Sequence, residues 1–232
     1  MQFSTAITSV FLPKVTGMVA LGDDRDKISN LFIKTGRIQY IVMSAILFGF
    51  IVFGKTFINL WAGPTYSEAY EITVVFFVAL IIPSIQNLGI TILQARNQMK
   101  FRSLLYIAIA AVALLMQIVL SKRYGGIGCA IAISAALFVG QGLIMNIYYQ
   151  RKQGFNVIKF WVEIAKMSVC PVIVTALSMF LTTYICVESW SALICGIAIY
   201  GVIYFVLQYF FAMNNSERRL FMTPIKKIFK IA

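Results

Sequence analysis

The sequence predicts an all-α fold, a polytopic transmembrane helical bundle of about six full spans plus one truncated N-terminal span. Two observations predict it. Hydrophobic residues make up 60% of the 232 residues and charged residues only 12%, whereas soluble proteins average about 25% charged residues. The uncharged runs between charges are also long, and a helix of about 20 residues crosses a hydrocarbon core of roughly 30 Å. Helices are favoured because backbone groups in lipid must be paired internally.

The first predicted helix covers residues 1–21. Its uncharged part ends at Pro13 and covers roughly 20 Å at helical rise. Lys14 follows at once, and Pro13 should kink or loosen the helix. A signal peptide is excluded because its positive charges precede the apolar run, whereas the first charge here follows it. We therefore expect the last part of a transmembrane helix whose start is missing.

Six further uncharged runs predict the remaining spans. The first of them has 17 residues and needs its helix to continue past Lys55 to Trp61, while the other five have 19 to 28 residues. Pro83 should kink the second run. The runs are Ile38–Gly54, Ile72–Ala95, Ser103–Ser121, Tyr124–Gln150, Met167–Val187 and Ser189–Ser216.

The positive charges predict the orientation. Seventeen of the twenty cationic residues fall in alternate segments that would share one side, and only Lys55, Lys122 and Arg123 would lie on the other. The positive-inside rule makes the first side cytoplasmic, with a cytoplasmic C-terminus. The net charge of +12 is therefore mostly topological, and without a basic soluble domain it indicates no nucleic-acid partner. The seventeen are Lys14, Arg25, Lys27, Lys34, Arg37, Arg96, Lys100, Arg102, Arg151, Lys152, Lys159, Lys166, Arg218, Arg219, Lys226, Lys227 and Lys230.

The chain divides into three regions. Residues 1–150 form one bundle, residues 151–213 add two transmembrane helices, and residues 214–232 form a basic cytoplasmic tail. The segments Gly22–Arg37 and Arg151–Lys166 lie along the cytoplasmic interface or extend the helices. The tail mixes apolar residues with five cations, which favours a helix on anionic lipid over the alternative, a recruited protein partner.

Few residues offer catalytic chemistry. Histidine is absent, so no imidazole base or ligand exists. Cys129, Cys170, Cys186 and Cys195 are scattered within spans and are read as small apolar fillers. We expect a protein that is not an enzyme and has no metal or cofactor. The acidic residues all lie outside the apolar runs, and those at Asp23–Asp26 are read as a solvated, helix-capping loop. They are Asp23, Asp24, Asp26, Glu68, Glu71, Glu163, Glu188 and Glu217.

Uncharged polar residues form a stripe along the 72–95 helix. At 100° per residue they share an arc of roughly 80°, which Gln86 interrupts. Buried polar residues in lipid either join helices or line a wet cavity. For any single polar residue, a contact that joins two helices is the favoured role. For the five-residue stripe, the lining of a wet cavity is favoured. The candidates are Ser84, Asn87, Thr91, Gln94 and Gln98, with Gln117 and Gln141 on the next two helices.

Four stretches, in order along residues 1–150, carry a family resemblance. "SVFLPKVTGMVALGDDRDK" is a proline-ended helix before a charged loop, and "LQARNQMKFRS" is a small basic loop. "FGKTFINLWAGPTYSEAYEI" and "YGGIGCAIAISAAL" contain the matching single residues. Together they resemble the C-terminal half of bacterial polysaccharide flippases, the O-antigen and lipid-linked oligosaccharide translocases of the MATE-like MOP superfamily. The matching residues are Gly63, Tyr66, Ala69, Tyr124, Gly126, Ile127, Gly128 and Ala130. The chain departs from the pattern at Ser121–Arg123 and at Cys129.

The resemblance implies a membrane transporter that moves lipid-linked polysaccharide repeat units across the cytoplasmic membrane of a bacterium. Residues 1–150 would be the C-terminal bundle, which rocks against a second bundle around a central cavity. The polar stripe would face the sugar. Lys14, Arg96 or Lys100 would attract the phosphate.

The expected partners are a lipid-linked oligosaccharide, membrane lipids, and a missing N-terminal half or other polysaccharide-assembly proteins. We therefore expect the chain alone to be poorly stable and inactive. Two alternatives stay open: a drug or metabolite exporter on the same fold, and a membrane-embedded polysaccharide polymerase or acyltransferase. An acidic residue inside a span would favour the exporter, and an acid or histidine in a long outer loop would favour the enzyme.

Overall fold

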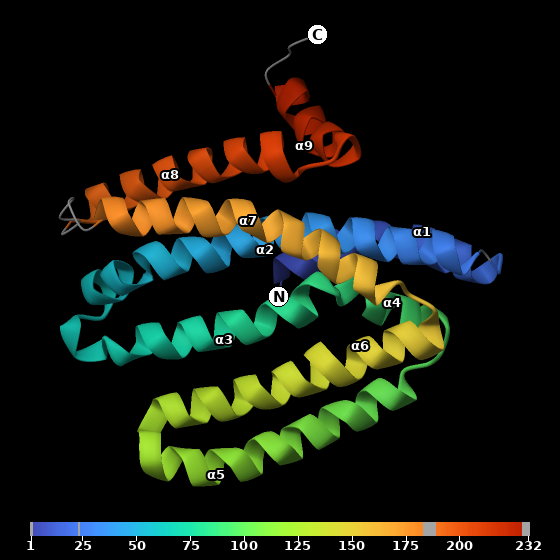
Figure 1. The fold of residues 1–232 in the computed structure, drawn as a ribbon, viewed down its shortest axis with the longest axis horizontal. Helices are drawn as coiled ribbons and strands as arrows, with labels where there is room; N and C mark the ends of the chain where they lie inside the picture. Colours follow the sequence, from blue (N-terminus) through green and yellow to red (C-terminus); the bar gives the residue numbers. More distant parts are fainter. Residues whose placement is uncertain (1, 23, 183–188, 229–232) are drawn as a thin grey trace.

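The computed structural model describes residues 2–22, 24–182 and 189–228, and within these ranges it contains helices and no strand (Figure 1). The predicted all-α fold is confirmed. Five residues named above, Asp23, Cys186, Val187, Glu188 and Lys230, lie outside the described part of the chain.

The long helices lie side by side, and the chain passes back and forth between the two ends of the bundle (Figure 1). Besides α-helices, the described residues form one short 3₁₀ turn (η1) and three π-helical segments (η2, η3 and η4). In chain order the elements are α1 (Gln2–Ala20), α2 (Arg25–Trp61), η1 (Pro64–Tyr66), α3 (Glu68–Ile85), α4 (Asn87–Ala95), α5 (Lys100–Leu137), η2 (Phe138–Ile144), α6 (Met145–Tyr148), η3 (Tyr149–Gln153), α7 (Val157–Thr182), α8 (Trp190–Leu207), η4 (Gln208–Ala212) and α9 (Asn215–Ile228).

The segment Lys100–Gln153 runs along the bundle twice, because the chain reverses its direction at Gly125. This glycine has φ 58° and ψ −134°, a conformation that residues with a Cβ avoid. The parts before and after it run antiparallel (Figure 1). Among the described residues, five stretches are long and apolar enough to cross a membrane. Since one of them doubles back, they supply the six full spans that the sequence predicts, with α1 before them.

Helix α2 is longer than a bilayer requires. It begins at Arg25, where the Asp24 carboxylate accepts from the Asp26 amide at 3.4 Å, so the predicted capping role is confirmed for Asp24. It continues past Lys55 to Trp61, as predicted. Its 37 residues extend about 55 Å. Of the two alternatives for Gly22–Arg37 and Arg151–Lys166, extension of the helices is the one observed.

The connections from α1 to α2, from α4 to α5 and from η3 to α7 lie at one end of the bundle, and the connection from α2 to α3 lies at the other (Figure 1). At one end, which we call the basic end, Gly22, Arg96 and Lys152 line one pocket. Arg37 there contacts Glu163 and Glu217, which belong to α7 and α9. At the other end the Phe57 ring meets the Trp190 ring edge-on, and Gly126 lies beside Ile72.

This arrangement makes the predicted orientation testable. Ser67, at the start of α3, and Ser216, in the first turn of α9 after the last span, are both exposed, and the sequence predicts them on opposite sides of the membrane. We expect Ser67→Cys to react with a membrane-impermeant thiol reagent from outside the cell and Ser216→Cys only after the membrane is opened, because 17 of the 20 cations favour a cytoplasmic basic end. The parent chain reports the background labelling of its own cysteines. Labelling of Ser67→Cys from the cytoplasm alone would reverse the orientation.

An aromatic core lies near the basic end, where α2, α7 and the end of η3 meet. The Phe32 ring stacks on Phe155 at 4.9 Å between centroids and contacts Phe160 at 5.0 Å and Tyr149 at 5.7 Å. All four side chains are buried. Packed aromatic pairs add about 0.5–1.5 kcal/mol each beyond the area they bury, so this aromatic core fixes α2 against α7.

Gly36 allows α2 to approach α3 and α7 closely. A Cβ atom at this position would lie 2.4 Å from the Phe160 ring and 2.8 Å from the carbonyl oxygen of Ile85. The second contact is with backbone, which cannot rotate away. The small residue therefore sets the distance between the three helices, as is typical of helix packing in membranes.

Candidate functional site

The helix that carries the polar stripe is broken in its middle. α3 ends at Ile85 and α4 begins at Asn87, with Gln86 between them at φ −103° and ψ 14°. Pro83 lies in the last turn of α3 and removes one helical hydrogen bond there. The predicted kink is therefore a break between two helices, three residues beyond the proline.

Gln86, which interrupts the stripe in the sequence, joins three helices. Its side chain is buried, and its Nε2 donates to Asn146 Oδ1 at 2.7 Å. The Trp161 indole donates to the same oxygen at 3.2 Å. The stripe pattern missed this residue. Its position next to a proline kink was the available signal, because a broken helix frees backbone and side-chain groups for new partners.

Ser84 belongs to a second junction, where α1 meets α2 and α3. The Ser4 hydroxyl donates to the Ser84 carbonyl oxygen at 2.5 Å. The Gln39 amide donates to Ser4 Oγ at 3.1 Å and to Thr8 Oγ1 at 2.8 Å. All four side chains are buried. Here the polar groups join helices.

The structure divides the five stripe residues between two environments. Ser84 and Thr91 are buried, Asn87 is partly exposed, and Gln94 and Gln98 are exposed. On α4, positions 87 and 94 are seven residues apart and share one face. Ser84 and Thr91 pack against protein and form the buried half of the stripe, whereas Asn87, Gln94 and Gln98 keep exposed surface and form its open half.

Gln117 and Gln141 lie on other helices. Gln117 is half-buried on α5, and Gln141 is buried within η2. Within the described chain, Gln141 Nε2 has no hydrogen-bond partner. Neither residue lines the polar pocket at the basic end of the bundle.

The open half of the stripe ends at a polar pocket of about 610 Å³, which we call the cationic pocket. It lies where the ends of α1 and α4 meet the start of α2 and the end of η3. Three cations face one carboxylate there, so the pocket carries a net positive charge. Its lining is Val19, Gly22, Asp24, Arg25, Ile28, Arg96, Gln98 and Lys152.

Gln153 holds two of the lining side chains in place. Its Oε1 accepts from Arg96 Nη1 at 2.7 Å, and its Nε2 donates to Gln98 Oε1 at 2.6 Å. Gln153 is only 1% exposed, so its amide is fixed and orients both neighbours. Gln153 and Arg96 are 57 residues apart along the chain, so this contact could not be predicted from the sequence.

Arg96 is poised to accept an anion. Burial, together with the nearby charge of Arg25, lowers the pKa of Arg96. Both effects disfavour the charged guanidinium, and a bound anion would oppose both. The site therefore suits a phosphate or carboxylate, which guanidinium groups bind with paired hydrogen bonds.

Of the three phosphate-attracting candidates, only Arg96 lines the cationic pocket. Lys14 on α1 and Lys100 at the start of α5 are exposed and stand outside the lining. Arg25 and Lys152 occupy the pocket instead. The sequence placed both on the same side as Arg96, but it could not show which loops meet.

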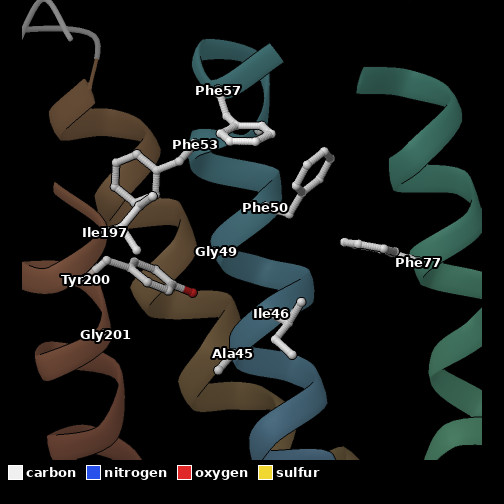
Figure 2. Close-up of a pocket in the computed structure, with 11 residues that line it drawn as sticks. Ala45, Ile46, Gly49, Phe50, Phe53, Phe57, Phe77, Ile197, Tyr200 and Gly201 are labelled. Carbon is white, nitrogen blue, oxygen red and sulfur yellow. The ribbon is translucent and has the colours of Figure 1, made fainter. Parts of the chain in front are cut away.

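An apolar pocket of about 450 Å³ lies in the other half of the bundle, between α2, α3 and α8. Figure 2 shows Phe50, Phe53 and Phe57 along α2, with Phe77 on α3 and Tyr200 on α8 facing them. The lining is almost wholly carbon, so the pocket suits a hydrocarbon chain rather than a polar group.

Comparison with protein-family models, with curated proteins and with solved structures finds no match to this chain. In the described part of the chain no three His, Cys, Asp or Glu side chains gather in a way that could hold a metal ion. The function is therefore argued from the membrane fold, the cationic pocket and the apolar pocket.

Proposed function

We propose that this chain is a flippase, a transporter that moves lipid-linked polysaccharide repeat units across the cytoplasmic membrane of a bacterium. In this proposal the basic end and the C-terminus face the cytoplasm. The expected cargo has a polyprenyl chain that stays in the bilayer, a phosphate-containing link, and a polar sugar head.

The main free-energy barrier to transport is the passage of the polar head group through the hydrocarbon layer. Moving one unpaired hydroxyl or amide into hydrocarbon costs several kcal/mol, so several hydroxyls and a pyrophosphate would cost tens of kcal/mol. A path lined by neutral hydrogen-bonding side chains removes most of this barrier. A cation at its mouth captures the phosphate.

The observation that carries the proposal is the junction of the open stripe with the cationic pocket. Gln94 and Gln98 are exposed along one end of α4, and Gln98 itself lines the pocket beside Arg96. Neutral donors and acceptors for a sugar thus lead to guanidinium groups for a phosphate. This shared lining supports the proposal.

The apolar pocket favours a lipid-linked cargo over one part of the exporter alternative, a soluble metabolite. A soluble metabolite needs only the cationic pocket. A polyprenyl lipid also needs a surface for hydrocarbon, and Phe50, Phe53 and Phe77 provide one.

Deleting the gene in its own host tests the function. We expect surface glycan to fall and lipid-linked oligosaccharide to accumulate in the inner leaflet, with both restored by a plasmid copy. A metabolite exporter would leave the lipid-linked pool unchanged. Normal surface glycan in the deletion strain would exclude the proposal.

The open stripe can be tested separately from the buried half. We expect the double variant Asn87→Leu/Gln94→Leu to lower export about tenfold at normal protein level, since each lost hydrogen bond is worth about 0.5–1.5 kcal/mol. Thr91→Val, one turn away but buried, is the control and should alter stability rather than export per molecule. Surface glycan and immunoblotting measure both quantities. If the double variant is well expressed and exports normally, the stripe has no part in transport.

A further inference from the structure

A second polar pocket lies at the basic end, between α2, α7 and the start of α9. Its volume is about 420 Å³, and it shares no lining residue with the cationic pocket. Its lining is Asn30, Ile33, Lys34, Arg37, Lys159, Glu163, Asn214, Ser216 and Glu217. We call it the α9 pocket.

Both carboxylates of the α9 pocket already have partners. Glu217 accepts from Arg37 Nε at 2.6 Å and Nη2 at 3.0 Å, and from the Asn214 amide at 2.8 Å. Glu163 accepts from Arg37 Nη1 and lies 3.4 Å from Lys166 Nζ. Arg37 therefore pairs with the carboxylates of Glu163 and Glu217, which would otherwise attract the two lysines of the pocket.

The two lysines of the pocket are left without a carboxylate. In the described chain no ion pair joins Lys34 or Lys159 to an acid. Lys34 is half-buried and Lys159 is exposed, and they reach the pocket from different helices. Exposed Asn214 and Ser216 add neutral hydrogen-bonding groups. Two free ammonium groups beside neutral donors form a site for a phosphate group.

The position of the pocket identifies the source of that phosphate. It opens at the end of the spans, beside the first turn of a helix that carries Arg218 and Arg219 and follows the last span directly. Basic pockets between transmembrane helices on the cytoplasmic side bind anionic lipid head groups. We propose that the α9 pocket binds the head-group phosphate of an anionic phospholipid and that the bound lipid holds α9 against α2 and α7.

The experiment measures the thermal stability of the purified full chain in neutral detergent. We expect phosphatidylglycerol to raise the melting temperature, phosphatidylcholine to have no effect, and inorganic phosphate to have a much smaller effect. Each lysine near an anionic surface contributes roughly a factor of five in affinity. The double variant Lys34→Gln/Lys159→Gln should therefore need about 30-fold more phosphatidylglycerol for the same shift.

Matched variants separate the site from general attraction. Lys100→Gln/Arg151→Gln removes the same charge at the same end from exposed positions outside the pocket and should respond as the parent does. Lys34→Arg/Lys159→Arg should keep the response. The site would be overturned if Lys34→Gln/Lys159→Gln needed no more phosphatidylglycerol than the parent for the same rise in melting temperature. It would also be overturned if the control variant lost the response equally. Equal stabilisation by inorganic phosphate would assign it to free phosphate and overturn the lipid.

Discussion

The substitution Arg37→Met should lower the stability of the protein by about 3–5 kcal/mol, the usual cost of removing one partner from a buried ion pair. Arg37 is 4% exposed and Glu217 is 1% exposed. Without the guanidinium, the backbone amide of Asn214 is the one partner that Glu217 keeps among the described residues. The melting temperature should fall by roughly 10 °C. Trypsin should cleave at Arg218 and Arg219 much faster, because α9 loses its attachment to α2.

Removing all the charges together should restore much of this stability. Replacing a whole buried ionic cluster with neutral side chains is often close to neutral, so Arg37→Met/Glu163→Gln/Glu217→Gln should melt well above Arg37→Met alone. Lys166→Ala is the control. Its contact with Glu163 is long and its side chain 70% exposed, and such pairs contribute about 1 kcal/mol or less. An Arg37→Met protein that melts with the parent and resists trypsin equally would show that the cluster does not hold α9.

The double variant Arg25→Gln/Arg96→Gln should reduce export about 100-fold. A hydrogen bond to a charged group contributes about 1.5–3 kcal/mol, so each lost guanidinium should cost roughly tenfold or more. Both residues line the cationic pocket. Surface glycan and the inner-leaflet pool of lipid-linked oligosaccharide are the measurements, with protein level followed by immunoblot.

The control for this variant is Lys100→Gln/Arg151→Gln, which removes equal charge at the basic end outside the pocket. It should export nearly normally. An equal loss in both double variants would mean that overall charge, rather than the cationic pocket, drives capture. Gln153→Leu gives a further comparison: it leaves both arginines but releases Arg96, and we expect an intermediate loss.

The sequence was sufficient for the spans, because the length of each apolar run is a local property. The continuation of α2 to Trp61 and the division of the Lys100–Gln153 segment into two spans followed from runs of residues read in order, although the predicted boundary was at Lys122 and Arg123 and the chain reverses at Gly125. The exact break of the second full span did not follow. Pro83 indicated a kink, but the helix is interrupted at Gln86. The side chain of Gln86 there donates to the buried Asn146, which lies 60 residues away in the sequence.

The polar contacts between helices were beyond the reach of the sequence. Arg37 and Glu217 are 180 residues apart. The sequence placed Arg37 in a segment that lies along the cytoplasmic interface or extends the helices, and Glu217 in a basic tail on anionic lipid. The charge pattern correctly placed them at one end, but charge alone does not tell which loop residues are buried together. The stripe likewise mixed two kinds of residue. Ser84 and Gln94 lie on one arc of an ideal helix, but only packing decides that the first is buried and the second exposed.

The aromatic core has a consequence for calorimetry. It surrounds Phe32, only seven residues after the start of a helix some 25 Å longer than the hydrocarbon layer, so its surface is removed from water rather than from lipid. Exposure of apolar surface to water raises heat capacity, whereas helices that separate within lipid change their contact with water little. The increase in heat capacity on unfolding should thus arise mainly from Phe32, Tyr149, Phe155 and their neighbours. On cooling, this part of the protein should weaken before the spans do.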